Sequence, residues 1–164
     1  MRVNVGAGRL TFKGWVNCDV QQNPKAPHKL DHLCDARSIP LADGCASEVM
    51  ALHLIEHFYL WEAPAVLAEW RRLLRPAGKL TLELPNLRKA CENVLAGRAD
   101  QMAMWPLYGD PGHRDPFMCH RWGYTPETIT ALLQANGFSS VQVLPPKTHG
   151  GNPQRDMRVE AIKA

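Results

Sequence analysis

The sequence predicts a single α/β domain with a mostly parallel, seven-stranded sheet and an antiparallel final strand. Strand-like and helical segments alternate along the chain, which is typical of a parallel sheet covered by helices. The 164 residues (18.4 kDa) suffice for one hydrophobic core. The last two apolar stretches are joined without a helix between them, so they should pair antiparallel. Ligands of such sheets bind at the carboxyl ends of the strands.

Seven apolar segments of strand length support this prediction. They are Arg2–Val5, Trp15–Val20, Leu30–Cys34, Ser47–Leu52, Leu80–Leu84, Val141–Leu144 and Arg158–Ile162.

Three segments are expected to be helices. Apolar residues recur at helical spacing within Trp61–Leu74, and Pro76-Ala77-Gly78 should end that helix. A second helix is expected over Leu87–Leu95. In the third, Thr125 is a good N-cap, Pro126 occupies the first turn and Gly137 follows the last turn.

Residues 98–124 show no hydrophobic period and hold several aromatic side chains. A structureless stretch of this length in a compact domain is usually a lid or a binding loop. We therefore expect residues 98–124 to cover a substrate site. Its aromatic residues would either shield the core or form a platform for a ring of the substrate.

Charge and cysteine content limit the functional classes. The net charge of +3 does not indicate a strong polyanion binder. The excess positive charge lies in residues 61–99, and its cations surround a predicted helix end: Arg71, Arg72, Arg75 and Lys79. Cations stabilise the C-terminal end of a helix through the helix dipole. The alternative is a patch that binds phosphate or nucleic acid. The five cysteines have no metal or disulfide spacing, which predicts reduced thiols and a cytoplasmic location. No signal peptide or membrane span is expected.

A glycine-containing turn follows the first predicted strand. Gly6 and Gly8 would let the backbone approach a ligand, and Asp19 could accept from the two hydroxyls of a ribose; an ordinary tight turn is the alternative. A dinucleotide fingerprint would require a third glycine, but Thr11 occupies that position. The sequence therefore argues against a nicotinamide enzyme.

Longer motifs flank the central strand. Asp35-Ala36-Arg37-Ser38-Ile39-Pro40-Leu41 precedes it, Leu52-His53-Leu54-Ile55-Glu56-His57-Phe58 follows it, and Glu69-Trp70-Arg71-Arg72-Leu73-Leu74-Arg75-Pro76-Ala77-Gly78 lies beyond. This order resembles the class I S-adenosylmethionine (SAM)-dependent methyltransferases, in particular small members of methyltransferase type 11. Gly14-Trp15-Val16-Asn17 and His120-Arg121-Trp122-Gly123-Tyr124 fit the same pattern. The resemblance implies a Rossmann-like three-layer sandwich over residues 1–164, with reduced helices between strands 1 and 3.

The resemblance also implies a SAM site. The first turn would face the methionine and ribose parts, Asp19 would hold the ribose hydroxyls, and Asp35 would accept from the adenine amino group. Asn4 stands where many members of the family carry an acidic residue. The implied cofactor-binding residues are Val5, Gly6, Ala7, Gly8, Asp19, Val20, Asp35, Ala36, His53 and Leu54.

Two histidines of the expected lid, His113 and His120, are candidates for a catalytic base, since histidine titrates near neutral pH. The alternative is that both hydrogen-bond the loop to the sheet. His53 and His57 are four residues apart, but no Glu directly follows His53 as in a zinc-protease helix. No metal site is therefore expected.

These features favour SAM-dependent methyl transfer to a small molecule or glycan precursor. One alternative is a non-catalytic SAM-binding accessory protein. Nucleic-acid methylation is disfavoured, because Leu52-His53-Leu54-Ile55 stands where amino-methylating DNA enzymes carry Asn/Asp-Pro-Pro-aromatic. Exposed lid aromatics would favour a homodimer.

Overall fold

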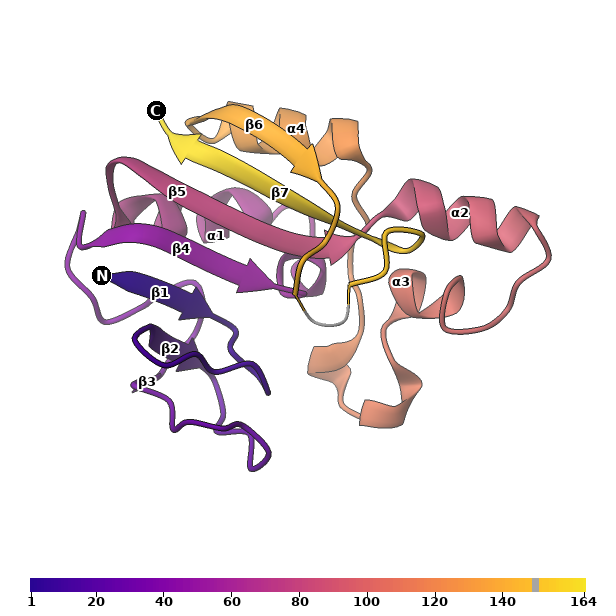
Figure 1. Cartoon of the computed structure of the whole chain (residues 1–164), viewed down its shortest axis with the longest axis horizontal. Coiled ribbons are helices and arrows are strands. Elements are labelled where there is room, and N and C mark those ends of the chain that lie inside the picture. The colour runs from indigo at the N-terminus through magenta and orange to yellow at the C-terminus, as the bar shows by residue number, and fades with distance from the viewer. Residues whose placement is uncertain (149–150) are drawn as a thin grey trace.

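The computed structural model describes residues 1–148 and 151–164. Its seven strands form one sheet in the order β3-β2-β1-β4-β5-β7-β6. Strands β1 to β5 pair in parallel, and β7 runs antiparallel to both β5 and β6, as the opposed arrow in Figure 1 shows. The predicted α/β class with a mostly parallel, seven-stranded sheet is confirmed. Of the three layers expected, one holds no helix of the described residues, because the helices that cover the sheet lie on one face alone (Figure 1). The strands are β1 (Arg2–Val5), β2 (Val16–Asp19), β3 (His32–Leu33), β4 (Ala46–Leu52), β5 (Leu74–Pro85), β6 (Phe138–Leu144) and β7 (Asp156–Lys163).

All three predicted helices form. They are α1 (Ala63–Leu73), α2 (Leu87–Leu95) and α4 (Pro126–Ala135). The side chain of Asn86 accepts from the backbone at the start of α2, and Thr125 caps α4 as its sequence position predicts. Of the described residues, none forms a helix with the length and apolar character needed to cross a membrane.

Strand β5 is longer than predicted. Ala46 of β4 pairs with Leu74, whereas Glu48 pairs with Lys79, so the residues between Leu74 and Lys79 leave the regular register. Ala77 has a positive φ of 56° within this irregularity. Pro76-Ala77-Gly78 therefore forms a bulge inside a strand, and the helix has already ended before it.

The predicted loss of helices is confirmed between β1 and β2 and between β2 and β3, and residues 34–45 before β4 are also non-helical. Two buried asparagines hold the loop after β1 instead. The Nδ2 of Asn4 donates to the Leu10 carbonyl at 2.7 Å and to Oδ1 of Asn17 at 3.1 Å. Asn17 in turn accepts from the Phe12 N–H and donates to the Phe12 and Trp15 carbonyls. Backbone groups that a helix would satisfy are thus paired with side chains.

The two faces of the sheet differ in chemistry. Leu80, Leu82 and Leu84 of β5 join the core formed with the apolar sides of α1 and α4, which lie behind the sheet in Figure 1. The alternating positions of β5 and β7 project to the other side, in front of which Figure 1 shows no helix of the described chain. We call this side the polar face; it carries Glu48, Lys79, Thr81, Glu83, Arg158 and Glu160.

Ion pairs cross the polar face from strand to strand. Lys79 lies between Glu48 and Glu160, and Arg158 lies between Glu160 and Glu83. These contacts satisfy polar groups on a sheet face that has no helical cover.

Two of the cations around the end of α1, Arg71 and Arg72, have internal partners. Arg72 pairs with Glu69 and Asp43, and Arg71 donates to the carbonyls of Gly137 and Ala164. This arrangement favours a structural role over a nucleic-acid patch.

The expectation that residues 98–124 have no regular structure is wrong in part. The segment contains helix α3 (Met104–Tyr108) and the 3-10 turns η2 (Pro111–His113) and η3 (Pro116–Met118). Met102, Ala103 and Pro106 are buried. Tertiary packing therefore orders this segment, although its sequence has no hydrophobic period. In Figure 1 this segment lies beyond the carboxyl ends of β1, β4 and β5.

Candidate functional site

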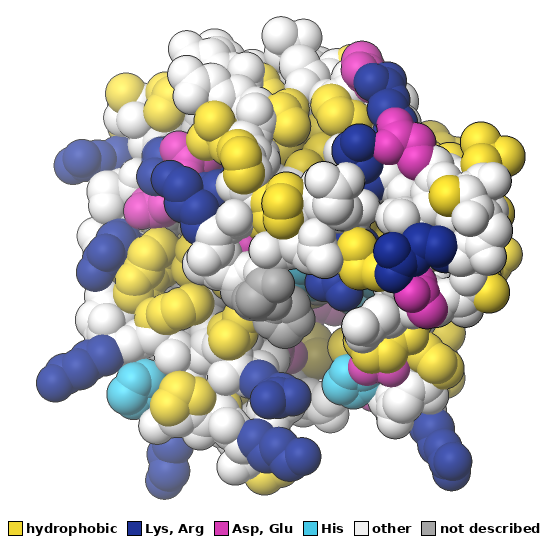
Figure 2. Space-filling view, turned by 45° about the vertical axis from the view of Figure 1, so that its right-hand side comes forward, with side chains coloured by type: hydrophobic (Ala, Val, Ile, Leu, Met, Phe, Trp, Pro, Cys, Tyr) yellow, Lys and Arg dark blue, Asp and Glu magenta, His cyan; other side chains and the backbone are white. Residues whose placement is uncertain are grey.

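A cavity of about 840 Å³ opens at the carboxyl ends of the parallel strands, in the size range of small-molecule sites. All ten residues predicted to contact a cofactor line this cavity, and so do His113 and His120. Figure 2 shows the molecule hollowed on this side, with histidine and acidic side chains at the walls. Lysines and arginines are scattered over the same face and do not form one patch.

The turn after β1 forms one wall. Gly6 and Gly8 have positive φ values of 65° and 50°, a backbone region that favours glycine. A Cβ at Gly6 would lie 2.7 Å from a methyl carbon of Leu54, whereas a Cβ at Gly8 would meet nothing closer than 4.0 Å. The Gly8 N–H donates to Oδ2 of Asp19 at 2.7 Å. Asp19 therefore fixes the turn while it faces the cavity.

Asp35 is already engaged by a cation. Arg37 donates to both carboxylate oxygens of Asp35, at 2.9 Å and 2.7 Å, and also pairs with Glu62. The adjacent guanidinium lowers the pKa of Asp35 below its usual value. The carbonyl of the next residue, Ala36, accepts from the buried indole of Trp70 at 3.0 Å, which fixes this edge of the cavity.

The end of β4 turns sharply into η1 (Ile55–His57). His53 has a φ of 50°, and its N–H donates to the Glu83 carbonyl at 2.7 Å. Its Nδ1 lies 3.3 Å from Oε1 of Glu56, whose side chain is buried. Burial alone would lower the pKa of His53, but the Glu56 carboxylate raises it above its usual value. A left-handed backbone at a non-glycine residue is the kind of strain that functional sites retain.

The segment after the lid runs beside η1. The N–H groups of Arg121 and Trp122 both donate to the Glu56 carbonyl, and the Arg121 guanidinium donates to the His57 carbonyl at 2.6 Å. His120 is thereby placed against Glu56, with its Nε2 4.0 Å from Oε1. Its Nδ1 lies 3.0 Å from the Pro106 carbonyl.

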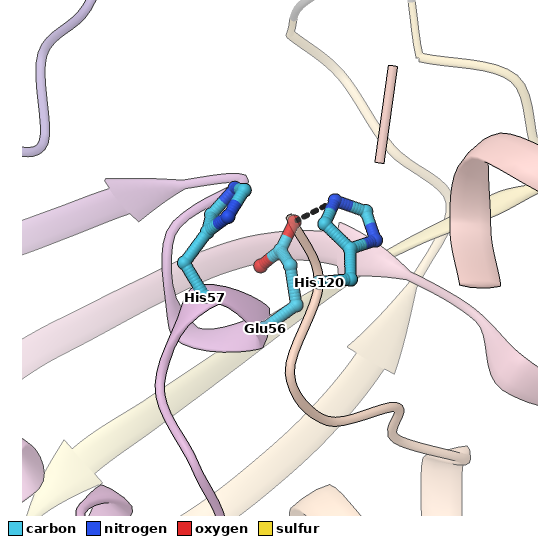
Figure 3. Close-up of side chains that lie close together, drawn as sticks. All are labelled: Glu56, His57 and His120. Carbon is cyan, nitrogen blue, oxygen red and sulfur yellow. Dashed lines mark ion pairs between the residues drawn. The ribbon is translucent and has the colours of Figure 1, made fainter. Parts of the chain in front are cut away.

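Figure 3 shows the Glu56 carboxylate between the rings of His57 and His120. His53 precedes the short η1 turn and His57 ends it, so the two histidines do not lie on one helix. Burial lowers the pKa of His57. Burial alone would raise the pKa of Glu56, but the three surrounding histidines lower it. Glu56 is thus held ionised inside the protein.

His113 occupies a different position. It lies at the wall of the cavity in η2, with Nε2 3.8 Å from the Asp110 carboxylate. Residues 98–124 therefore bring both histidines to the cavity wall, and His120 also to the Glu56 cluster.

Several residues of this site are not identified by sequence reasoning. Glu56 is the main one, and its signal is an acidic residue inside the apolar run Leu54-Ile55-Glu56-His57-Phe58. Arg155 and Asp156 reach the cavity from the start of β7, where they form a close ion pair. Nothing in the local sequence places that distant segment at the site.

Comparisons with known proteins agree with this architecture. Residues 14–82 match a family model described as a methyltransferase domain. No curated protein sequence matches the chain.

Solved structures match over almost the whole chain. A SAM-dependent methyltransferase from Archaeoglobus fulgidus is 15% identical, with a TM-score of 0.67 over 99% of this chain and 85% of its own. One from Methanosarcina mazei is 18% identical, with a TM-score of 0.65 over 99% and 91%. The 1,6-didemethyltoxoflavin-N1-methyltransferase of Burkholderia thailandensis, solved with S-adenosylhomocysteine, is 14% identical, with a TM-score of 0.65 over 99% and 70%.

These matches confirm the predicted resemblance. Residues 14–82 match the methyltransferase domain family, and the chain as a whole has the fold of the class I SAM-dependent methyltransferases.

Proposed function

We propose that the protein transfers a methyl group from SAM to a small molecule or glycan precursor. The observation that carries this proposal is the shared cavity. Residues from the ends of β1, β2 and β4, predicted separately as cofactor contacts, all line one hollow of suitable size. The methyltransferase-domain match over residues 14–82 supports the same reaction class.

The cavity residues fit SAM chemically. The left-handed turn at Gly6 and Gly8 exposes backbone without a side chain at Gly8, where a ligand can approach. Asp19 offers a carboxylate for ribose hydroxyls, and Asp35 offers one for the adenine amino group if Arg37 shares it. When bound, SAM supplies a methyl group on a positively charged sulfonium, so the protein's main task is to position the acceptor.

We propose that His113 acts as the base for an acceptor that must lose a proton. Its side chain is partly exposed at the cavity wall, and the Asp110 carboxylate 3.8 Å away can orient the ring. His120 was the other candidate. Its ring is held between the Pro106 carbonyl and Glu56, so its position supports a structural role more than that of a base.

Calorimetric titration with SAM and S-adenosylhomocysteine tests cofactor binding. Saturable binding of both is expected, and no binding at millimolar ligand would refute the proposal. A screen with radioactive methyl-SAM over sugars, small acids and nucleic acids then tests catalysis. Binding without transfer to any acceptor would favour the alternative of an accessory SAM-binding protein. Transfer to nucleic acid would contradict the small-molecule assignment.

The surroundings of the protein are proposed on separate observations. All five cysteines are free thiols, which supports a cytoplasmic location. Tyr108, Phe117 and Trp122 of the lid are exposed, which supports a homodimer. Light scattering after size-exclusion chromatography measures the mass directly, and a monomer of 18.4 kDa at high concentration would rule the dimer out.

A further inference from the structure

Three side chains beside the cavity form a cluster that the proposed function does not require; His57 and His120 line the cavity, and Glu56 lies buried next to them. Glu56, His57 and His120 each offer one ligand atom, and these atoms all lie within 4.8 Å of one another. We propose that this cluster binds one divalent, redox-inert metal ion of the zinc class. This differs from the sequence expectation of no metal site, because η1 and the segment after the lid meet only in the folded chain.

The carboxylate of Glu56 supports the proposal most directly. The residue is 1% exposed, and neither of its oxygens accepts a hydrogen bond from residues 1–148 or 151–164. A buried carboxylate is costly unless cations compensate its charge, and the His53 ring beside Oε1 is one such partner. A metal ion bound between Glu56, His57 and His120 would add a second. His53, with Nδ1 3.3 Å from Oε1, flanks the carboxylate and can orient it.

Both ligand histidines are oriented as metal-binding histidines are. The Nδ1 of His57 lies 3.2 Å from the Cys119 carbonyl, and that of His120 lies 3.0 Å from the Pro106 carbonyl. A proton on each Nδ1, donated to these carbonyls, leaves Nε2 as the nitrogen with a free electron pair. Metal-bound histidines commonly donate their other ring N–H to a carbonyl in this way. The Nε2 of His120 faces Glu56 at 4.0 Å.

The spacing permits coordination after a small closure. Tetrahedral zinc with ligands at about 2.1 Å separates ligand atoms by roughly 3.4 Å. The 4.0 Å between His120 and Glu56 must therefore shorten by about 0.6 Å, and ligand atoms as far as 4.8 Å apart by up to about 1.4 Å. Side-chain rotations of the two histidines, which line the cavity and are not fully buried, can supply this shift.

The chemistry of the ligands selects the ion. Two imidazoles with one carboxylate suit zinc, whereas magnesium prefers oxygen ligands and water. Three protein ligands leave a fourth position open, as in catalytic zinc sites. Because His57 and His120 line the cavity, that position faces the substrate side. A metal ion with this open position would bind an oxygen atom of the methyl acceptor. That role rests on the proposed function, but the binding of the metal ion does not depend on it.

Metal binding is measured directly on the full chain, without SAM. The chain is dialysed against chelator and titrated with Zn²⁺ by calorimetry; Co²⁺ absorption in the visible range reports tetrahedral coordination. We expect one Zn²⁺ per chain, a Co²⁺ spectrum of tetrahedral type, and no comparable binding of Mg²⁺. Glu56→Gln and His120→Gln each remove one ligand. Each should weaken Zn²⁺ binding by more than the 10–100-fold that loss of an outer partner costs.

His28→Gln is the matched control, because His28 is exposed and lies outside the cavity. It should bind Zn²⁺ as the wild type does. Circular dichroism establishes that each variant is folded, and His57→Gln replaces any variant that is not. Wild-type protein that binds less than one fifth of an equivalent of Zn²⁺, or folded ligand variants that bind with unchanged affinity, would overturn the proposal. Loss of Zn²⁺ binding with intact SAM binding, or the reverse, separates this inference from the proposed function.

Discussion

Replacing Asp19 with asparagine tests the placement of the cofactor. The substitution keeps the size and one acceptor oxygen of the side chain but removes its charge. In the structure, Oδ2 of Asp19 already accepts from the Gly8 N–H at 2.7 Å. The amide oxygen of asparagine can keep that bond, which leaves an NH₂ group, and no acceptor, for the ribose.

The magnitude follows from the bonds lost. A hydrogen bond to a charged group contributes about 1.5–3 kcal/mol, and each 1.4 kcal/mol is tenfold in affinity. Asp19→Asn should therefore weaken the binding of S-adenosylhomocysteine by about 10–150-fold. Asp19→Ala also loses the anchor of Gly8, which adds on the order of 1 kcal/mol.

Calorimetry with S-adenosylhomocysteine measures the effect, because this product cannot donate a methyl group during titration. Asp43→Asn is the matched control. The Asp43 side chain is 80% exposed, pairs with Arg72 and lies outside the cavity, so its loss should leave the affinity unchanged. If Asp19→Asn binds within twofold of the wild type, Asp19 does not hold the ribose and the site has been placed wrongly.

Three further predictions concern the neighbouring polar groups. Asp35→Asn should weaken S-adenosylhomocysteine binding by about 1.5–3 kcal/mol in calorimetry. The free energy of unfolding in urea should change little, because the partner of Asp35, Arg37, is half exposed. An unchanged affinity would exclude Asp35 as the adenine contact. Asn4→Asp should lower the free energy of unfolding in urea by about 1–3 kcal/mol, because a carboxylate cannot donate to the Leu10 carbonyl; a stable variant would show that this brace is dispensable. Burial alone would raise the pKa of Glu83, but hydrogen bonds from Thr148, Lys147 and Arg158 lower it below its usual value. Its contribution to stability is therefore full above the pKa of the unfolded chain and is lost as the pH falls through the lowered pKa. Glu83→Gln should flatten this acid-side loss of stability in urea titrations.

The sequence predicts the sheet well because its strands are amphipathic or buried. Leu80, Leu82 and Leu84 alternate with polar residues, and this period alone identifies β5 and its core-facing side. Helix α2 begins and ends as predicted because the cap at Asn86 and the apolar spacing agree. The lengthening of β5 was not predictable, since pairing of Leu74 with Ala46 across a bulge is a tertiary event.

The candidate site divides in the same way. The residues predicted to contact the cofactor end strands or follow them closely, so sequence order alone brings them to one edge of the sheet. The cluster around Glu56 could not be predicted, because it depends on hydrogen bonds between η1 and residues more than 60 positions later. Helix α3 was not predicted, because its five residues have no hydrophobic periodicity and are ordered by tertiary packing.

Residues 98–124, the proposed lid, are held to the rest of the domain by hydrogen bonds near both ends. At its start, Nδ2 of Asn93 donates to the carbonyls of Met102 and Gln154. At its end, Arg121 and Trp122 bind the Glu56 carbonyl. The stretch between these points contributes no strand to the sheet. On the proposed function, we expect substitutions at its exposed cavity-lining residues, such as His113 and Phe117, to alter which acceptor enters. The buried Ala103 and Pro106 are instead needed for packing. Such exposed positions, and not the buried ones, are where a change of acceptor specificity would be sought.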